Sequence, residues 1–502
     1  MDGSASGNGD VPVSSADYPT DPSPGPITRI ALESVARISP NLAYVKPLRS
    51  ALLTRLRNQI QSGRLQRPPV PTPPGVRDDR MIMGLALIDT FERALDEGRI
   101  SRISMQKGAS YIIESWLWGK GDAAAMQRFR GQYGTLPPNF LVISPGKGCN
   151  LQCVGCYADS GPTPEKMDWN VFDRIITECK TLWGKRSFVI SGGEPLAYRD
   201  HGKGLLDAAE KHGDCFFMFY TNGTLITDKV ADRMAEMGNI VPAISVEGWR
   251  GRTDERRGRG VYDKVVDAMN RLRERRVLFG LSLTATRYNA EEIFSDQFMD
   301  YFFGELKALF GWVFHYMPIG RKYTMELMPS AEQRLWMWQR SWELMRDKGY
   351  FLADFWNHGT TCNGCISAGR FSGGGYLYID WNGAVTPCVF VPYTPVNINQ
   401  VYARGGTIND MWADPFFAGI REWQESYNHG NGHPGNLMAP CLIRDHHDVL
   451  RRLISVHEPE PTDPSAEEAL LDPDYAQAMI DYGKAYQDLS GPIWEDVYLR
   501  QE

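Results

Sequence analysis

Six apolar runs alternate with amphipathic stretches between residues 139 and 350, and this alternation constrains the fold more than any other feature. The apolar runs are Phe140–Ile143, Phe188–Ile190, Phe216–Tyr220, Val241–Val246, Leu278–Leu283 and Trp312–Met317. The amphipathic stretches are Trp169–Trp183, Gly204–Lys211, Asp228–Met237, Tyr262–Arg275, Glu292–Phe310 and Glu332–Asp347. Such repeats are typical of a parallel sheet buried on both faces. We expect a partial barrel or a doubly wound sheet, and both place chemistry at the carboxyl ends of the strands.

The segments that flank this core differ from it in composition. Residues 1–28 contain few large apolar side chains, so we expect them to be disordered. Residues 29–138 are expected to form a helical region with a Pro-rich linker. Residues 351–456 are expected to form a small extension rich in cysteine and glycine, and residues 457–502 an acidic tail of short helices, packed on the core or partly free.

Charge and hydropathy exclude several classes of protein. The formal net charge is −7, which argues against a nucleic-acid binder. We find no apolar run of transmembrane length and no secretory signal, so we expect a cytoplasmic protein. Residues 29–67 are basic, and Leu48, Leu52, Leu53 and Leu56 recur there at helical spacing. Two alternatives remain for this segment: a helix packed on the neighbouring domain, or peripheral contact with an anionic membrane.

Seven of the nine cysteines fall into two clusters, which indicates metal binding in a reducing compartment instead of a disulfide framework. Cys149, Cys153 and Cys156 follow the first predicted strand with the spacing C-x3-C-x2-C. Three thiolates on a four-iron cluster leave one iron open to a small chelating molecule. The alternative is a zinc site with a fourth ligand from elsewhere, but zinc sites are usually built from paired C-x2-C units.

This loop resembles the signature of the radical S-adenosylmethionine (radical SAM) superfamily, including the aromatic Tyr157 just after the third cysteine. The resemblance implies a partial (β/α)6 barrel that carries a [4Fe–4S] cluster on the three cysteines. It also implies that the open iron binds S-adenosylmethionine. Reductive cleavage of that cofactor would give a 5′-deoxyadenosyl radical that abstracts hydrogen from a substrate.

Motifs at the ends of the next strands fit the same resemblance. Gly192, Gly193, Glu194 and Pro195 match the family's GGEP motif, which contacts the methionine part of the cofactor. Asn222, Ser245 and Glu247 end the third and fourth strands and are further candidate cofactor contacts. Arg256 and Arg257 follow; they either pair with the cofactor carboxylate or form a solvated charge run.

The second cluster consists of Cys362, Cys365, Cys388 and Cys441. Before Cys388, the segments Tyr376–Asp380 and Ala384–Pro387 flank Asn382-Gly383, a sequence typical of a tight hairpin. This hairpin resembles the SPASM or Twitch extensions of radical SAM enzymes, which hold auxiliary iron–sulfur clusters. The spacing departs from the full SPASM pattern, so zinc remains an alternative to a second [4Fe–4S] cluster. We expect His446 and His447 to face solvent, with ligand replacement as the alternative.

The resemblance implies an enzyme, and it favours a peptide or protein side chain as the substrate because this type of extension is common among members that modify peptides. A lipid or other hydrophobic metabolite is the alternative substrate, and a non-catalytic iron–sulfur or zinc scaffold is the alternative class of protein. The resemblance also implies a reducing partner such as flavodoxin or ferredoxin. Residues near the sixth strand and the second cluster are candidates for the substrate cavity, but the sequence assigns none of them a catalytic role: His315, Tyr316, Asp354, Trp356 and His358.

Overall fold

The protein is described here by a computed structural model. The structure describes residues 45–62, 72–112, 123–370, 374–429 and 434–500. The predictions for residues 1–28 and for most of the Pro-rich linker therefore lie outside the described residues.

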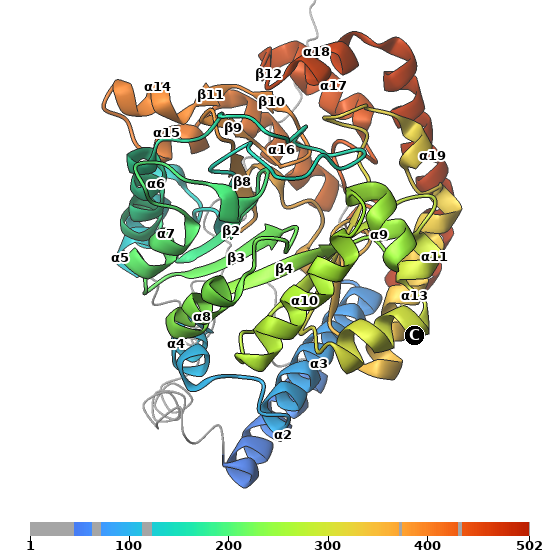
Figure 1. Cartoon of the computed structure of the whole chain (residues 1–502). Helices are drawn as coiled ribbons and strands as arrows, with labels where there is room; N and C mark the ends of the chain where they lie inside the picture. Colours follow the sequence, from blue (N-terminus) through green and yellow to red (C-terminus); the bar gives the residue numbers. More distant parts are fainter. Residues whose placement is uncertain (1–44, 63–71, 113–122, 371–373, 430–433, 501–502) are drawn as a thin grey trace, which may run out of the picture.

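One ten-stranded sheet forms the centre of the molecule (Figure 1), in the order β11-β9-β8-β1-β2-β3-β4-β5-β6-β7. Its first six strands are β1 (Phe140–Ile143), β2 (Ser187–Ile190), β3 (Phe216–Thr221), β4 (Ile240–Val246), β5 (Gly280–Ala285) and β6 (Gly311–His315). Each pairs in parallel with the next, for example Val142 with Val189 and Val189 with Met218. This arrangement confirms the predicted partial barrel over the alternating region.

The sheet extends beyond the six predicted strands at both edges. The three-residue strand β7 (Leu352–Asp354) adds in parallel to β6. At the other edge, β8 (Tyr376–Ile379) pairs in parallel with β1 and in antiparallel with β9 (Ala384–Thr386), which confirms the hairpin. The two-residue strand β11 (Val396–Asn397) follows β9, and β10 (Tyr393–Thr394) pairs separately with β12 (Glu460–Pro461). Strands of the cysteine-rich extension are therefore part of the same sheet as the barrel.

Helices connect the parallel strands and cover the outer face of the barrel. They are α6 (Trp169–Leu182), α7 (Leu205–Lys211), α8 (Asp228–Met237), α9 (Arg250–Arg257), α10 (Val261–Glu274) and α13 (Ala331–Lys348). Ser330 caps α13 in a capping box, since its hydroxyl accepts from Gln333 N at 3.1 Å and the Gln333 side chain accepts from Ser330 N at 3.0 Å.

The predicted helix over residues 292–310 is wrong as a single element. The segment breaks into α11 (Ala290–Ile293), α12 (Asp296–Met299) and a π-helical turn over Asp300–Glu305. The break occurs because the Ser295 hydroxyl accepts a hydrogen bond from Phe298 N at 3.2 Å and so starts a new helix. Local capping therefore overrides the continuous amphipathic pattern.

The N-terminal helices are α2 (Lys46–Gln61), α3 (Pro74–Asp96), α4 (Arg102–Ile112) and α5 (Ala123–Tyr133). Helix α2 packs on α3, where Arg57 Nη2 lies 2.6 Å from Asp89 Oδ1. This contact supports the packed-helix alternative for the basic segment. Leu48 is nevertheless 54% exposed, and membrane contact stays a prediction. Within the described ranges, no helix is both long and apolar enough to span a bilayer.

The cysteine-rich extension also contains α14 (Ile398–Ala403), α15 (Asn409–Trp412), α16 (Pro415–His429) and α17 (His447–His457). The short helices expected for residues 457–502 are found only in part, because the tail contains the short α18 (Pro464–Leu471) and the long α19 (Pro473–Ile493), followed by a π-helical turn over Trp494–Leu499. Helix α19 is 21 residues long and packs along α13 (Figure 1). The acidic sequence does not indicate this helix, because the buried face of α19 consists of tyrosine, methionine and glycine instead of a leucine stripe.

Gly483 sets how closely α19 approaches the rest of the fold, because a β-carbon there would lie 2.8 Å from the Asp445 carbonyl oxygen. We predict that Gly483→Ala lowers the free energy of unfolding by about 1–3 kcal/mol through overpacking. Gly131→Ala on helix α5 is the control. It meets open space and is expected to raise the free energy of unfolding by up to about 1 kcal/mol. Urea denaturation of both variants measures the difference, and equal midpoints would contradict the close contact.

Candidate active site

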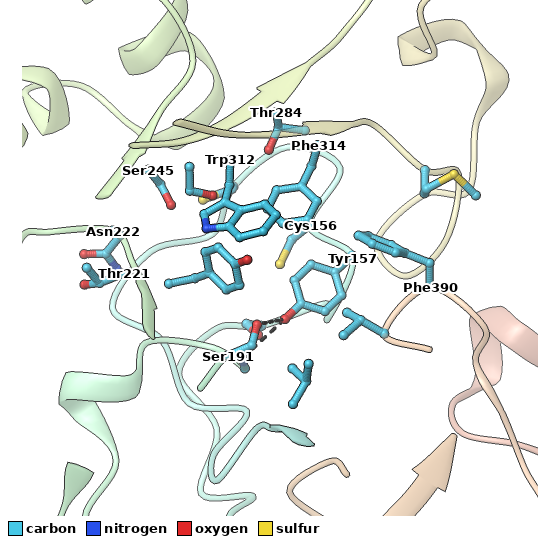
Figure 2. A pocket seen from close by; sticks show the side chains of 18 of the residues that line it. Cys156, Tyr157, Ser191, Thr221, Asn222, Ser245, Thr284, Trp312, Phe314 and Phe390 are labelled. Atoms are coloured by element: carbon cyan, nitrogen blue, oxygen red, sulfur yellow. Dashed lines mark hydrogen bonds between the residues drawn. The ribbon is translucent and has the colours of Figure 1, made fainter. Parts of the chain in front are cut away.

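The cysteine loop after β1 lies at the mouth of a cavity of about 230 Å³ inside the barrel (Figure 2). Cys149, Cys153 and Cys156 all line this cavity. Burial raises the pKa of the Cys149 thiol to about 11. The structure therefore brings the three predicted ligands together at the carboxyl end of the sheet, where parallel α/β folds place their sites.

Backbone hydrogen bonds fix the loop and leave the three thiols facing the cavity. Cys149 N donates to Gly161 O at 2.8 Å, and Arg321 N donates to Cys156 O at 3.0 Å. The Arg321 guanidinium also donates to Cys153 O at 3.0 Å and pairs with Asp159 at 2.8 Å. Arg321 follows β6 in the sequence, so an element far along the chain holds the loop in place.

The double glycine after β2 packs directly on the cysteine loop. Gly193 N donates to Gly146 O at 2.9 Å, and Glu194 N donates to Gly148 O at 3.0 Å. A β-carbon on Gly193 would lie 2.3 Å from the carbonyl oxygens of Lys147 and Gly148. Gly193 is therefore required for the two loops to meet, and both Gly192 and Gly193 line the cavity.

Glu194 and Pro195 lie behind the cavity wall and are not among its lining residues. The Glu194 carboxylate accepts hydrogen bonds from Thr221 Oγ1 and Asn222 N, both at 2.8 Å, and from Leu196 N at 3.0 Å. Burial raises its pKa, although these hydrogen bonds oppose the shift. The side chain ties the loop after β2 to the end of β3, and Pro195 begins a short 3-10 helix.

Tyr157, Asn222 and Ser245 all line the cavity (Figure 2). The Tyr157 hydroxyl is hydrogen bonded to Ser191 Oγ and accepts from Gly192 N at 3.3 Å, so the ring is held in the wall. The Asn222 amide donates to Asn150 Oδ1 at 2.9 Å. These three predicted positions therefore face the same space as the cysteines.

Glu247 is buried and does not line this cavity. Its carboxylate pairs with Arg256 at 2.7 Å and with Arg257, whose Nε lies at 2.8 Å. Burial opposes the charge on Arg257, yet Glu247 and the Cys153 sulfur raise its pKa overall. The two arginines are therefore not a solvated charge run. Arg257 lies beside the cysteine loop, with Nη1 4.0 Å from Cys153 Sγ.

Much of the cavity wall consists of apolar and aromatic side chains that no motif identified. They come from alternate positions of the barrel strands and from the segments after β7 and β9: Val142, Val189, Met218, Tyr220, Trp312, Phe314, Phe355, Val389 and Phe390. Trp312 Nε1 donates to Met218 Sδ at 3.1 Å, which satisfies the indole inside the barrel. The alternation of inward residues along each strand was the signal available in the sequence.

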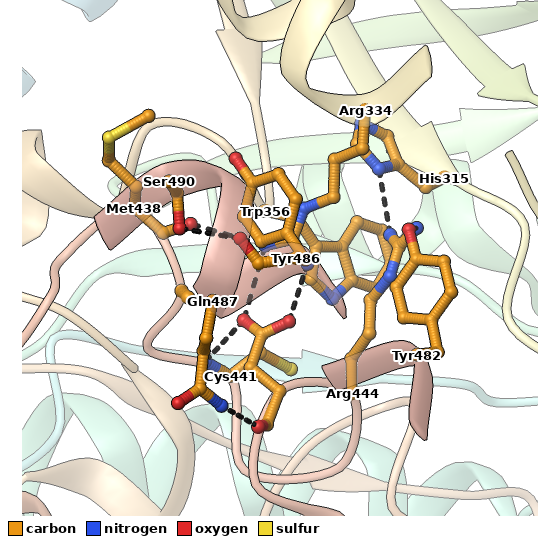
Figure 3. Close-up of polar contacts among 12 residues, drawn as sticks. His315, Arg334, Trp356, Met438, Cys441, Arg444, Tyr482, Tyr486, Gln487 and Ser490 are labelled. Carbon is orange, nitrogen blue, oxygen red and sulfur yellow. Dashed lines mark hydrogen bonds and ion pairs between the residues drawn. The ribbon is translucent and has the colours of Figure 1, made fainter. Parts of the chain in front are cut away.

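His315 lines the cavity at the end of β6 and is hydrogen bonded through both ring nitrogens. Nε2 lies 2.9 Å from Asp354 Oδ2. Nδ1 lies 2.7 Å from Arg444 Nη1 (Figure 3). Because an arginine can only donate, Nδ1 is the acceptor and the ring is neutral. Burial and the Arg444 charge lower the His315 pKa to about 4, against the opposing effect of Asp354.

A buried polar network continues from His315 to Cys441. Asp354 accepts from the Asn357 amide at 2.9 Å, and Asn357 Oδ1 accepts from Arg334 Nε at 3.2 Å. Arg334 pairs with Asp445, whose carboxylate also accepts from Cys441 N at 3.0 Å (Figure 3). Among the predicted cavity candidates, His315 and Tyr316 line the space, while Asp354, Trp356 and His358 support it from behind.

The second group of cysteines gathers beyond β8. Burial, Asp445 and the neighbouring Cys365 and Cys388 thiols all raise the pKa of Cys441. Burial, with a further contribution from Cys365, raises the pKa of Cys388 to about 12. Cys362 is affected by Cys365 in the same direction. The four predicted ligands are therefore close enough to act on one another electrostatically.

Neither histidine after Cys441 behaves as predicted. His447 is buried, and its Nδ1 lies 3.0 Å from Ile443 O. His446 Nε2 lies 2.9 Å from Ala439 O. The expectation that they face solvent is wrong, because α17 begins at His447 and packs against α16 and α19.

Comparisons with known proteins agree with this geometry. Residues 143–293 match the family model described as the radical SAM superfamily. The mycofactocin maturase MftC of Mycolicibacterium smegmatis is 27% identical over 291 residues, which cover 55% of this chain and 71% of the maturase. The AdoMet-dependent heme synthase of Methanosarcina barkeri is 25% identical over 293 residues, or 53% of this chain and 81% of the synthase.

Solved structures show the same fold. Streptococcus suis SuiB, crystallised with S-adenosylmethionine, is similar with a TM-score of 0.50 at 18% identity. The superposition covers 74% of this chain and 90% of SuiB. The similarity therefore extends beyond the barrel strands to most of the known structure.

The contact between the two loops generates a prediction about cofactor binding. Gly193→Ala is expected to separate the loops at a cost of about 1–3 kcal/mol, which is roughly five- to 150-fold in affinity for S-adenosylmethionine. Gly146→Ala is the matched control, since its β-carbon would meet the Tyr198 ring at an ordinary 3.5 Å. Equilibrium binding to the anaerobic, iron-loaded variants measures the effect, and equal affinities would show that the close contact is unnecessary.

Proposed function

Since this chain is a radical SAM enzyme, we propose that it abstracts hydrogen from a peptide or protein, an apolar side chain of which enters the barrel cavity. The family uses a [4Fe–4S] cluster and S-adenosylmethionine, and this pair supplies the 5′-deoxyadenosyl radical when bound. The observation that carries the proposal is that three cysteines and a double glycine line one cavity together with an apolar wall.

The predicted site residues have three roles in this proposal. Cys149, Cys153 and Cys156 hold the cofactor-binding cluster. Tyr157, Gly192, Gly193, Asn222 and Ser245 shape the cofactor site, while Glu194, Pro195 and Glu247 fix the loops that present it. Burial of the Cys149 thiol means that loading iron must displace a proton.

We assign Cys362, Cys365, Cys388 and Cys441 to a second [4Fe–4S] cluster instead of zinc. Sulfurs around a tetrahedral zinc lie roughly 3.8 Å apart, as follows from a Zn–S distance of about 2.3 Å. Among the described residues, no three cysteine sulfurs lie within 4.8 Å of one another. A cubane holds its thiolates at the corners of a larger body, so the wider spacing favours iron–sulfur.

The apolar lining supports the substrate class. No aspartate or glutamate is among the described residues that line the cavity, and its two arginines are both paired with Glu247. The similarity to a mycofactocin maturase favours a peptide. A hydrophobic small molecule is the second candidate, favoured by the same lining and by the similarity to a heme synthase. A flavodoxin or ferredoxin would supply the electron.

The cluster assignment predicts how cofactor cleavage depends on the first triad. Replacing Cys149, Cys153 and Cys156 together by alanine should lower iron per chain by about half, on four irons per cluster. Wild-type protein with dithionite and S-adenosylmethionine should form 5′-deoxyadenosine under anaerobic conditions. The triple variant should form none.

Cys179→Ala is the control for this experiment, because that thiol is buried in the core and belongs to neither cluster. It should leave iron content and 5′-deoxyadenosine formation unchanged. Deoxyadenosine from the triple variant, or none from iron-replete wild type, would overturn the assignment.

The substrate class is tested by comparing cells that contain the wild-type gene with cells that contain the triad variant. A peptide substrate should appear as a peptide whose mass changes only when the triad is intact. A difference confined to small apolar molecules would instead support the second candidate and contradict the peptide proposal.

A further inference from the structure

Strand β8 separates the two groups of cysteines. It pairs in parallel with β1, whose end leads into the first triad, with Phe140 opposite Tyr376 and Val142 opposite Tyr378. The hairpin then returns through β9 to Cys388. One short strand therefore faces the barrel cavity and also contacts the second cysteine group.

Tyr376 at the start of β8 makes both contacts. Its ring lines the cavity and stacks on Phe140 with centroids 5.3 Å apart and an interplanar angle of 5°. Its hydroxyl lies 2.9 Å from Cys388 Sγ, and the residue is 2% exposed. Tyr376 therefore joins the wall of the cavity to a predicted ligand of the second cluster.

The direction of this hydrogen bond follows from the chemistry of the thiol. A cysteine bound to iron is a thiolate and has no proton, so the phenol must be the donor. A donor to a ligand sulfur stabilises the reduced cluster, which carries more negative charge, and so raises its reduction potential. The backbone supplies a further donor, since Phe390 N lies 3.5 Å from the same sulfur.

We propose that Tyr376 is a positioning residue that raises the reduction potential of the second cluster from the wall of the substrate cavity. The inference rests on the second [4Fe–4S] cluster proposed above. The same ring borders the cavity. A substrate that packs against the ring therefore changes the position of the hydroxyl that donates to Cys388 Sγ. Tyr376 thereby connects the substrate site with the second cluster.

The test uses full-length protein in which Cys149, Cys153 and Cys156 are replaced by alanine, so that only the second cluster is loaded. Tyr376→Phe keeps the ring and removes the donor. Tyr378→Phe is the matched control, because Tyr378 is buried on the same strand and its hydroxyl donates instead to Ser144 Oγ at 2.8 Å. Anaerobic redox titration followed by electron paramagnetic resonance gives the midpoint potential of each variant.

We expect a more negative midpoint potential for Tyr376→Phe and no shift for Tyr378→Phe. Where Tyr376→Phe does not load iron, Tyr376→3,5-difluorotyrosine replaces it. Its more acidic hydroxyl keeps the bond and strengthens it, so the potential should shift in the positive direction.

Four results would overturn the inference. Equal potentials in Tyr376→Phe and its parent, or an unshifted potential with difluorotyrosine, would reject the role of Tyr376 while leaving the second cluster in place. Equal shifts in Tyr376→Phe and Tyr378→Phe would indicate a general loosening of β8. Stoichiometric zinc without iron in the parent would reject the second cluster itself, and the inference with it, while the first cluster would stand.

Discussion

Backbone contact between the cysteine loop and the double glycine holds the site together. Gly193 N reaches Gly146 O at 2.9 Å, and a single β-carbon at Gly193 would collide with two carbonyl oxygens. Cys149, Cys153 and Cys156 belong to one of these loops, and the cavity lies where both meet. Because the contact is between main chains, it fixes the two loops relative to each other and does not involve the cysteine thiols.

The parallel pairing of β8 with β1 is the second contact that shapes the cavity. It brings a hairpin from the extension beside the first barrel strand, so that the extension completes the cavity wall with Tyr376 and Phe390. The enzyme is therefore not a barrel with a separate appendage. The extension and the barrel therefore share the side chains of one cavity wall.

Buried charges anchor the extension on its other side. Arg334 on α13 pairs with Asp445, and Arg444 bonds His315 and the Tyr482 hydroxyl of α19. Leaving one partner of such a buried pair unpaired typically costs about 3–5 kcal/mol, so the network fixes the Cys441 segment firmly. His315 belongs to this network and is neutral. Both of its ring nitrogens are hydrogen bonded, so it does not present a free base to the cavity.

The sequence by itself determined the barrel strands and the cofactor loop. Six apolar runs became β1 to β6, and the hairpin at Gly383 formed as predicted, because period and turn residues act over a few neighbouring positions. The cysteine spacing and the two glycines of the GGEP motif identified residues that do meet at one cavity, while Glu194 and Pro195 lie behind its wall.

Only the tertiary structure decided which side chains face the cavity and which support it. Glu194, in the GGEP motif, and Glu247, at the end of the fourth strand, were both candidate cofactor contacts in the sequence. Both carboxylates are instead used within the protein, by Thr221 and by two arginines. The three-residue strand β7, the β8–β1 pairing and the Tyr376–Cys388 contact were likewise hidden. Each depends on partners distant in the chain, and sequence pattern carries no information about pairing at that separation.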